Sequence, residues 1–422
     1  MSRKIRIDTR AFRENRDYRL LFSAGMITMF GSFITNVSIP FHIAQITGSY
    51  VAVGIIGAIQ LVPLVVFGLW GGAIADVFHR KKVVLLTEFA LMLCTGILLI
   101  NAMQDEPALW VIYVVAFLFS ALDGIQRPSL EALLPQLVNT SQLPSASSLN
   151  SLRWNIGSIV GPTIGGFFAA QFGVTFNYGL DVISYMISIL ILMRLGYVHV
   201  IKEELKLNIT FVFSGFNYAR KRPDLLGTYT IDIIAMIFAF PNALFPFIAL
   251  EFDAPWALGL LYASMSVGAL IATSTSGWTS HVNFRGKAIV IAATAWGIAI
   301  AASGLAPNIY FVFIALMFAG AADMISGLFR SLVWNTTVPL DMRGRLAGIE
   351  MLSYSLGPQL GQVRSTFVAE ISGLRASLFT GGVMCALGAS SIAVGLRQLW
   401  NFDDRTNEYA ISERKARHEE NF

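Results

Sequence analysis

The chain has 422 residues, of which 55% are hydrophobic and only 13% are charged, and its mean hydropathy is +0.63. Because soluble globular proteins carry roughly 25% charged residues, this composition excludes an ordinary soluble domain. A transmembrane barrel is excluded too, since it needs segments of about ten residues with alternating polarity, and the sequence shows no such alternation. The net charge of +4 indicates no nucleic-acid partner, because the basic residues gather in particular loops. We expect a polytopic α-helical protein of the lipid bilayer.

Stretches of about 20 mostly apolar residues, the length that crosses a bilayer, predict the membrane spans. Twelve such stretches occur, at 20–44, 51–74, 83–103, 108–126, 148–171, 176–195, 225–249, 256–277, 287–306, 308–329, 347–369 and 376–396. Basic residues precede the first span and follow spans two, six, eight, ten and twelve, whereas the loops between are nearly free of them, Arg375 being the exception. The positive-inside rule then places both termini in the cytoplasm. An even number of spans is required, and twelve fits.

We therefore predict five regions in a multi-pass protein of the cytoplasmic (inner) membrane. They are a cytoplasmic N-terminal segment at 1–19, a six-helix bundle at 20–195, a cytoplasmic linker at 196–224, a second six-helix bundle at 225–397 and a cytoplasmic tail at 398–422. The aromatic and basic stretch FVFSGFNYARKRP at 211–223 predicts an amphipathic helix on the membrane surface. The polar tail is expected to be partly disordered.

The two halves share an internal repeat. The matched pairs are Pro40 with Pro246, Gly54 with Gly259, Gly72 with Gly277, Arg80 with Arg285, and GPTIG at 161–165 with GPQLG at 357–361. Six spans and a linker are followed by six spans with glycine, proline and arginine at matching positions. This arrangement predicts two parallel six-helix bundles related by pseudo-symmetry. Secondary transporters with this layout have their substrate path between the halves.

Charged and polar residues inside spans are candidates for a proton or substrate pathway, because a charge at the bilayer centre costs at least about 2.5–3.5 kcal/mol. The candidates are Asn36, Gln60, Asp123, Arg127, Arg153, Asp232 and Asp323; Asp181 and Arg364 are further charges within spans.

Two sets of these candidates suggest different chemistry. Asp123 and Arg127 are four residues apart and can pair on one helical face, so a structural pair near the cytoplasmic surface is an equal alternative. Asp232 and Asp323 have no adjacent base in the sequence, and desolvation would make them proton carriers; an edge or snorkelling position is the alternative. Glu88 and His42 sit close to span ends, and we interpret them as structural.

The fifth span contains GSIVGPTIGG at 157–166. Gly157, Gly161 and Gly165 recur every four residues, which lets a neighbouring helix approach closely, and Pro162 removes a backbone hydrogen bond and kinks the helix. With Gly166, the order resembles the antiporter motif Gly-x-x-x-Gly-Pro-x-x-Gly-Gly of exporters of the major facilitator superfamily. Ordinary small-residue packing would explain the glycines but not this order.

The stretch GAIADVFHRKK at 72–82 resembles the loop between spans two and three of the same superfamily. The resemblance implies a cytoplasmic gate made of Gly72, Asp76, Arg80 and Lys81, in which the carboxylate caps a neighbouring helix and the basic residues pair with acidic partners. Val77 and His79 depart from the family pattern, and the second-half copy GWTSHVNFRGK lacks the aspartate.

The resemblance covers residues 17–397. Within the superfamily, the chain is similar to the drug:proton antiporter subgroup, which includes enterobactin exporters and macrolide or multidrug efflux proteins. The resemblance implies a monomeric transporter, not an enzyme, with no cofactor and no metal, that exports drugs or a siderophore of enterobactin type in exchange for protons. We expect protonation of Asp323, Asp232 or Asp123 to drive export, with Arg127 and Arg153 competing with the proton. Lack of a Gly-x-x-x-x-Gly-Lys-Ser/Thr loop argues against ATP-driven transport. The alternatives are a symporter that imports a small nutrient and a non-pumping partner protein.

Overall fold

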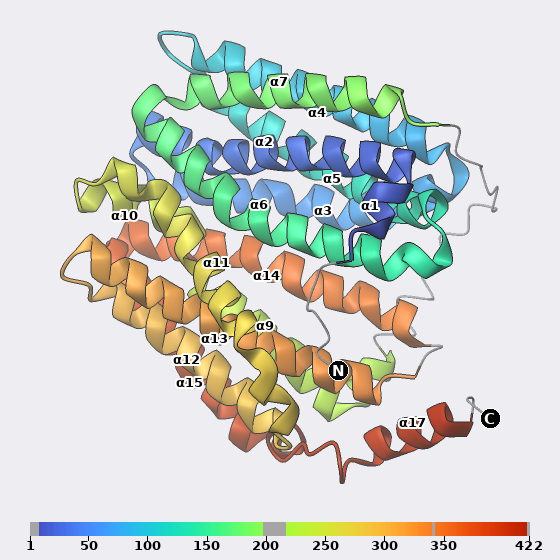
Figure 1. Cartoon of the computed structure of the whole chain (residues 1–422). Helices are drawn as coiled ribbons and strands as arrows, with labels where there is room; N and C mark the ends of the chain where they lie inside the picture. The colour runs from blue at the N-terminus through green and yellow to red at the C-terminus, as the bar shows by residue number, and fades with distance from the viewer. Residues whose placement is uncertain (1–7, 197–216, 340–341, 420–422) are drawn as a thin grey trace. The chain divides into compact units, whose positions relative to one another are not determined.

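The computed structural model describes residues 8–196, 217–339 and 342–419, and within these ranges every regular element is helical (Figure 1). The first half contains α1 (Arg10–Glu14), α2 (Arg16–Thr47), α3 (Tyr50–Val77), α4 (Arg80–Ala102), α5 (Leu109–Leu137), α6 (Leu143–Phe172) and α7 (Val174–Met193). The second half contains α9 (Pro223–Ala239), α10 (Phe245–Glu251), α11 (Leu258–Ser274), α12 (Arg285–Gly304), α13 (Ile309–Thr337), α14 (Arg343–Ser372), α15 (Leu374–Gly395), α16 (Arg397–Trp400) and α17 (Glu408–Glu419).

The predicted all-helical membrane fold is confirmed. Every predicted span coincides with helix, the seventh with α9 and α10 together, and ten segments of the described chain are long and apolar enough to cross a membrane. The two predicted spans outside that set lie on α6 and α14, which are 30-residue helices with many polar and small residues. Length therefore identified these two spans where hydropathy alone is weaker.

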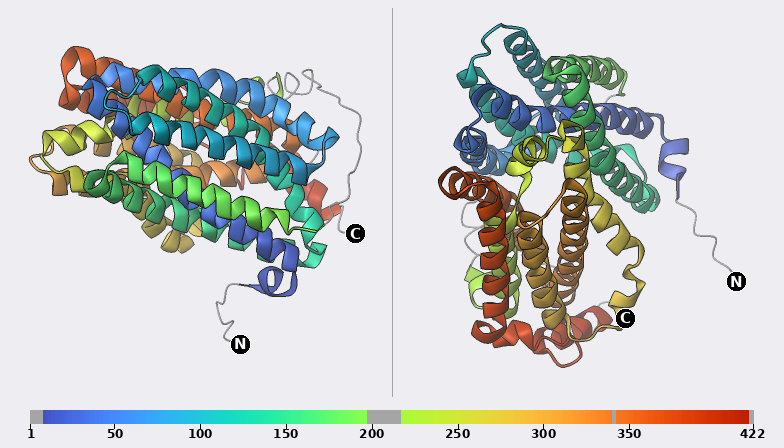
Figure 2. Two further views of the ribbon diagram at one scale, coloured as in Figure 1. Left: turned by 90° about the horizontal axis from the view of Figure 1, so that it is seen from above. Right: turned by 90° about the vertical axis from the view of Figure 1, so that its left-hand side faces the viewer.

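The chain divides into two compact units, which are described separately. The N-terminal unit comprises residues 1–52, 58–207 and 255–263, and the C-terminal unit comprises 53–57, 208–254 and 264–422. In the N-terminal unit α2 packs against α6 and α7, and α4 packs against α5 and α7 (Figure 2). In the C-terminal unit α12 packs against α13 and α15, and α9 packs against α14 and α15. The domain boundaries proposed from the sequence stay a prediction.

The internal repeat is visible at the helix junctions, where matching residues occupy matching positions. Gly173 links α6 to α7 with φ 81°, and Gly373 links α14 to α15 with φ 88°. Both lie in the left-handed region, which glycine adopts without the strain that a Cβ would bring. Arg80 and Arg285 begin α4 and α12. The first span of each half departs from the repeat. In span one α2 continues through Pro40, whereas in span seven α9 ends at Ala239 and a new helix begins at Phe245.

The chain end is ordered where the sequence suggested partial disorder. Leu399 and Phe402 are buried in the core of the C-terminal unit. Asp404 forms an ion pair with Arg285 at 2.8 Å, and hydrogen bonds from Arg405 hold the pKa of Asp403 at about 2. The expectation of disorder is therefore wrong for 398–419. The predicted surface helix at 211–223 is described only from residue 217 onward, where 217–220 are helical.

A buried ion pair precedes α9 and joins it to the chain end. Arg222 donates to Asp224 from Nε at 2.9 Å and from Nη2 at 2.7 Å, and both side chains are almost completely buried. The Arg222 guanidinium also donates to the Thr337 carbonyl at the end of α13 and lies 3.4 Å from the ring centroid of Tyr409 on α17. One guanidinium therefore ties together α9, α13 and α17.

We predict that Asp224→Asn lowers the thermal unfolding temperature of the purified protein, because removing one partner of a buried ion pair costs about 3–5 kcal/mol. The matched control is Asp8→Asn. Asp8 accepts from Arg10 at 3.1 and 2.8 Å with the same two-residue spacing, but on the exposed surface. Thermal unfolding in detergent should separate the two variants, and equal shifts would contradict the structural role of the buried pair.

Candidate functional site

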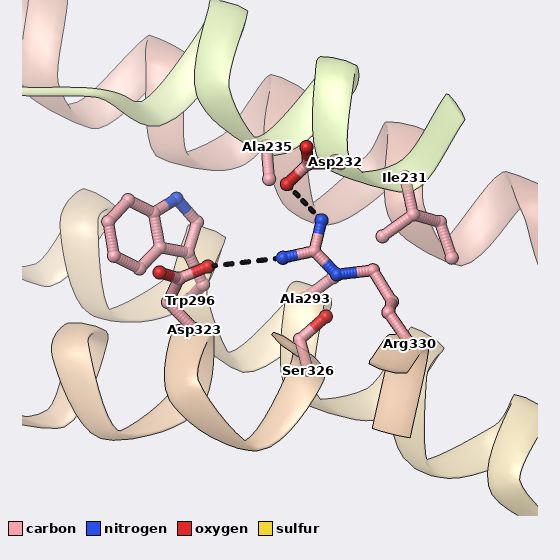
Figure 3. Close-up of a pocket in the computed structure, with 8 residues that line it drawn as sticks. All are labelled: Ile231, Asp232, Ala235, Ala293, Trp296, Asp323, Ser326 and Arg330. Carbon is pink, nitrogen blue, oxygen red and sulfur yellow. Dashed lines mark ion pairs between the residues drawn. The ribbon is translucent and has the colours of Figure 1, made fainter. Parts of the chain in front are cut away.

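One charge cluster of the C-terminal unit brings two predicted aspartates together. On α13, Asp323, Ser326 and Arg330 have spacings that place them on one face. Arg330 lies between two carboxylates: it forms an ion pair with Asp232 of α9, and its Nη2 lies 3.8 Å from Asp323 Oδ1 (Figure 3). One guanidinium is thus shared by two carboxylates.

The cluster lines a small pocket between α9, α12 and α13. Its lining residues are Ile231, Asp232, Ala235, Ala293, Trp296, Asp323, Ser326 and Arg330. The side chains leave almost no free space between them, whereas sites for drug-sized molecules occupy roughly 300–1,000 Å³. This pocket therefore suits a charge-switching centre better than a complete substrate site.

The three charges differ in exposure. The Asp232 side chain is 9% exposed and that of Arg330 20%, whereas that of Asp323 is 39% exposed. Asp232 has the closer contact with the guanidinium. Asp323 is therefore the more accessible and the more weakly paired carboxylate of the two.

Arg330 was missed by the sequence analysis: Asp232 and Asp323 have no adjacent base in the sequence, but the fold brings Arg330 to both. The predicted tenth span ended at residue 329, whereas α13 continues to Thr337. Arg330 lies seven residues after Asp323, two helical turns along the same face. That spacing was the indication available in the sequence.

The predicted pathway residues of α5 form a row of charges. Asp123 and Arg127 lie one turn apart on the exposed face, and Arg127 forms an ion pair with Glu131 at 3.3 Å, one turn further. Arg127 also acts electrostatically on Asp123. The structure therefore extends the predicted pair to three charges.

Arg153 of α6 is a different kind of cation. Its guanidinium lies beside Gly25 of α2, and 5.6 Å from the ring centroid of Phe22. Within the described parts of the chain Arg153 forms no ion pair, and its buried Nε has no hydrogen-bond partner. Next to it Trp154 is 60% exposed, and its ring lies 5.6 Å from that of Phe33.

The remaining polar candidates lie apart from these charges. Asn36 is exposed on α2, and Gln60 lies half-buried on α3, where its backbone carbonyl accepts from Ser120 at 2.9 Å. His42 and Glu88 are both 3% exposed. Glu88 lies well inside α4, more than two turns from its start, and accepts hydrogen bonds from Thr28; its interpretation as structural stays a prediction.

The glycine motif of α6 forms a close helix contact within the N-terminal unit. Gly157, Gly161, Pro162, Gly165 and Gly166 are all buried. A Cβ on Gly161 would lie 2.5 Å from Phe33 Cβ, and one on Gly165 would lie 2.8 Å from the Cα of Ile34. The predicted close approach is thus present, with α2 as the neighbour, and α6 runs through Pro162 as one helix.

The predicted gate is described in part. Arg80 donates to the Ala132 carbonyl near the end of α5 at 3.0 Å, and Lys81 donates to the Met193 and Leu195 carbonyls at the end of α7. These cations therefore neutralise helix C-termini, where positive charge is favourable. The contacts of Gly72 and of the Asp76 side chain lie outside what the structure describes.

Comparison with known proteins gives a consistent assignment. A family model described as transmembrane secretion effector matches residues 10–415. The chain is 27% identical to the enterobactin exporter of Citrobacter koseri and 26% identical to that of Salmonella typhimurium, each over 384 residues and 90% of both chains.

Solved structures show the same fold. A bacterial homologue of the iron transporter ferroportin in its inward-facing state matches with a TM-score of 0.72 and 14% identity, over 91% of this chain and 98% of that chain. The nucleoside transporter NupG matches with a TM-score of 0.70 and 14% identity, over 92% of this chain and all of that chain.

We predict that Gly165→Ala destabilises the protein by about 1–3 kcal/mol, the usual effect of overpacking, because the added methyl group would press on the backbone of α2. Gly179→Ala in α7 is the matched control, since a Cβ there meets nothing within 4 Å and alanine favours a helix. Thermal unfolding of the two purified variants tests this. A similar loss in both would show that the α2–α6 contact is not specifically tight.

Proposed function

The chain belongs to the transmembrane secretion effector family of major facilitator transporters, and from that premise we propose that it is a proton-coupled exporter of small amphipathic molecules. The family and the relatives are transporters, not enzymes. The observation that carries the proposal is the Asp232–Arg330–Asp323 cluster. It supports proton coupling for the following reasons.

The net charge of the cluster changes by one unit with one proton. With both carboxylates ionised, two negative charges share one guanidinium and the cluster carries a net charge of −1. A proton on Asp323 makes the cluster neutral and leaves the closer Arg330–Asp232 pair in place. Asp323 suits this role because it is the more exposed carboxylate.

A change of net charge alters the free energy of enclosing the cluster. Desolvating an unpaired charge costs several kcal/mol, whereas a neutral, paired arrangement costs less. The protonated cluster therefore favours conformations that shield it from water, and the ionised cluster favours hydrated ones. Proton binding and release would bias the transporter between two states in this way, as ligand-driven switching requires.

The substrate that the N-terminal unit favours is an acidic aromatic molecule. Arg153 is a cation without a carboxylate partner among the described residues, the Phe22 ring lies 5.6 Å from its guanidinium, and the adjacent Trp154 contacts the Phe33 ring. A guanidinium binds anions through charge-assisted hydrogen bonds. Since several relatives are named enterobactin exporters, we propose a siderophore of enterobactin type, an iron-chelating catecholate, as the first substrate to test before drugs.

The remaining parts of the proposal follow from the sequence. Both termini would lie in the cytoplasm, the chain would span the inner membrane as a monomer, and substrate would leave the cell as protons enter. The alternation of basic loops supports this orientation. The glycine motif of α6 supports export over import through its resemblance to the antiporter motif.

We predict that Asp323→Asn reduces proton-driven export by at least about tenfold, the change that ~1.4 kcal/mol produces, because the cluster can no longer change its net charge. Secretion of a catecholate siderophore and efflux of a fluorescent amphipathic cation should be measured in expressing cells, with and without a protonophore. Asp105→Asn, in an exposed loop, is the matched control. Unchanged, protonophore-sensitive export in Asp323→Asn and in Asp232→Asn would reject this cluster as the coupling site.

We further predict that Arg153→Gln weakens transport of the acidic substrate by about tenfold or more, because a hydrogen bond to a charged group contributes about 1.5–3 kcal/mol. The loss should appear as a higher KM for catecholate secretion, with efflux of the cationic dye retained. Arg405→Gln, in the chain-end segment, controls for loss of a positive charge. An equal decrease for the anionic and the cationic substrate would contradict a role of Arg153 in recognising negative charge.

A further inference from the structure

Three helices of the N-terminal unit carry polar residues at seven-residue spacing on their buried faces. The pairs are Thr28 and Thr35 on α2, Glu88 and Thr95 on α4, and Asp181 and Ser188 on α7, and all six side chains are buried. Seven residues correspond to about 10.5 Å along a helix. Because α7 packs against both α2 and α4, these pairs form two polar layers, each with one carboxyl group.

The first layer surrounds Glu88. Thr28 Oγ1 lies 3.1 Å from one carboxyl oxygen and 3.3 Å from the other, and Gln126 Nε2 of α5 lies 3.4 Å from Oε1. Ser188 of α7 is fully buried and lies beside the same carboxyl group, where its hydroxyl group can donate to it. The layer therefore surrounds one carboxyl group with hydroxyl and amide groups from α2, α5 and α7.

The second layer surrounds Asp181. Its Oδ2 accepts from Thr35 at 2.6 Å and from Thr95 at 3.3 Å, and its Oδ1 accepts from Ser184 at 3.1 Å. Gly31 of α2 makes room for this group, because a Cβ there would overlap Ser184 Oγ and Asp181 Oδ1. The carboxyl group is thus held in a fitted site.

Neither carboxyl group has a cationic partner. In the described ranges, Glu88 and Asp181 form no ion pair. The titratable group facing both is Tyr185 of α7, which shares a hydrogen bond with Ser32 at 3.2 Å, and Asp123 on the exposed face of α5 acts electrostatically on Tyr185. The other charged or titratable groups of this unit lie further along the helices. They are Arg127, which forms an ion pair with Glu131; Arg153, which lies beside Phe22; Tyr18; and the pair of His42 and Tyr178.

Two unpaired carboxylates in this interior would be costly, because one buried charge costs at least about 2.5–3.5 kcal/mol and Glu88 and Asp181 also act on each other electrostatically. The hydroxyl groups around them allow either protonation state. Thr95 can donate to the Leu91 carbonyl at 3.1 Å in place of Asp181, and Ser184 can donate to the Asp181 backbone carbonyl at 2.8 Å. The Ser188 hydroxyl group can donate to an ionised Glu88 or accept from a protonated one.

We propose that Glu88 and Asp181 form a second proton-binding site, inside the N-terminal unit and separate from the Asp232–Arg330–Asp323 cluster. A proton delivered by hydronium forms an O–H bond with a carboxylate oxygen and leaves one water molecule behind; release reverses this step. The part that this site plays in transport rests on the proposed function, whereas proton binding itself is a property of the pair. The sequence analysis named Asp181 as a further charge within a span and interpreted Glu88 as structural.

Infrared spectroscopy of the purified protein tests the proposal directly, with the proton as the only ligand. Spectra recorded from about pH 5 to about pH 9, a range that buried carboxyl groups can reach, should show carboxylic acid carbonyl bands that disappear as the groups ionise. Glu88→Gln should remove one band and Asp181→Asn another. Both replacements keep the side-chain size and can still accept hydrogen bonds. Asp105→Asn, in an exposed loop, keeps both carboxyl groups and should retain both bands.

Titrating bands that survive in Glu88→Gln and in Asp181→Asn, or no titration in the wild type, would overturn the proposal. If Glu88→Gln does not fold, as judged by thermal unfolding, Glu88→Asp replaces it and should shift the band instead of removing it; an unshifted band would overturn the assignment. Loss of the bands in the variants, combined with export by the wild type that ignores a protonophore, would reject proton-coupled export while leaving this proton site established.

Discussion

Placing a charge inside a membrane-spanning bundle is the constraint on which the rest of this structure depends, because each such charge must be paired, neutralised or brought to water. The chain meets this requirement in three ways. Arg222 and Asp224 form a bidentate pair with further contacts to α13 and α17. Asp232 and Asp323 share one guanidinium. Glu88 and Asp181 are surrounded by hydroxyl and amide groups alone. Only the first arrangement is charge-balanced, and so only the first is expected to be purely structural.

Close helix contacts set where those polar groups can lie. Gly165 lets α6 approach the backbone of α2 at Ile34, and Gly31 of the same helix opens space for the Asp181 carboxyl group from α7. Thr35, which follows Ile34, then reaches Asp181 at 2.6 Å. The antiporter-like motif and the polar layer therefore meet on consecutive residues of α2. A change in the packing of α6 on α2 would shift the groups that surround Asp181, because protein interiors are too densely packed to absorb a displacement locally.

The sequence predicted the helical architecture and the position of individual charges, but not which charges meet. The spans follow from runs of apolar residues, and the glycine motif predicted a tight helix contact. Arg330 was missed because hydropathy placed the end of the span one residue before it, whereas hydrogen bonding continues α13 to Thr337. Glu88 was dismissed for its sequence position, although its burial depends on α2 and α7, which are distant in sequence. Periodicity within one helix cannot show which face meets which neighbour; the seven-residue spacing acquires meaning only once three helices are packed.

Because the two units are related by an internal repeat, the residues at matching positions of the two units can be compared. Val174 and Leu374 begin α7 and α15, an offset of 374 − 174 = 200, which pairs Asp181 with Gly381. At Gly381 the space that a side chain would fill is occupied by the Arg364 guanidinium, which donates to the Phe238 carbonyl at 2.9 Å near the end of α9. That carbonyl is one of the last four of a helix, which have no helical partner, and the adjoining break contains Pro241. One half thus holds a carboxyl group against an unbroken α2, and the other holds a permanent cation against an interrupted helix. Because arginine stays charged at every physiological pH, a proton can be exchanged at this position only in the N-terminal unit.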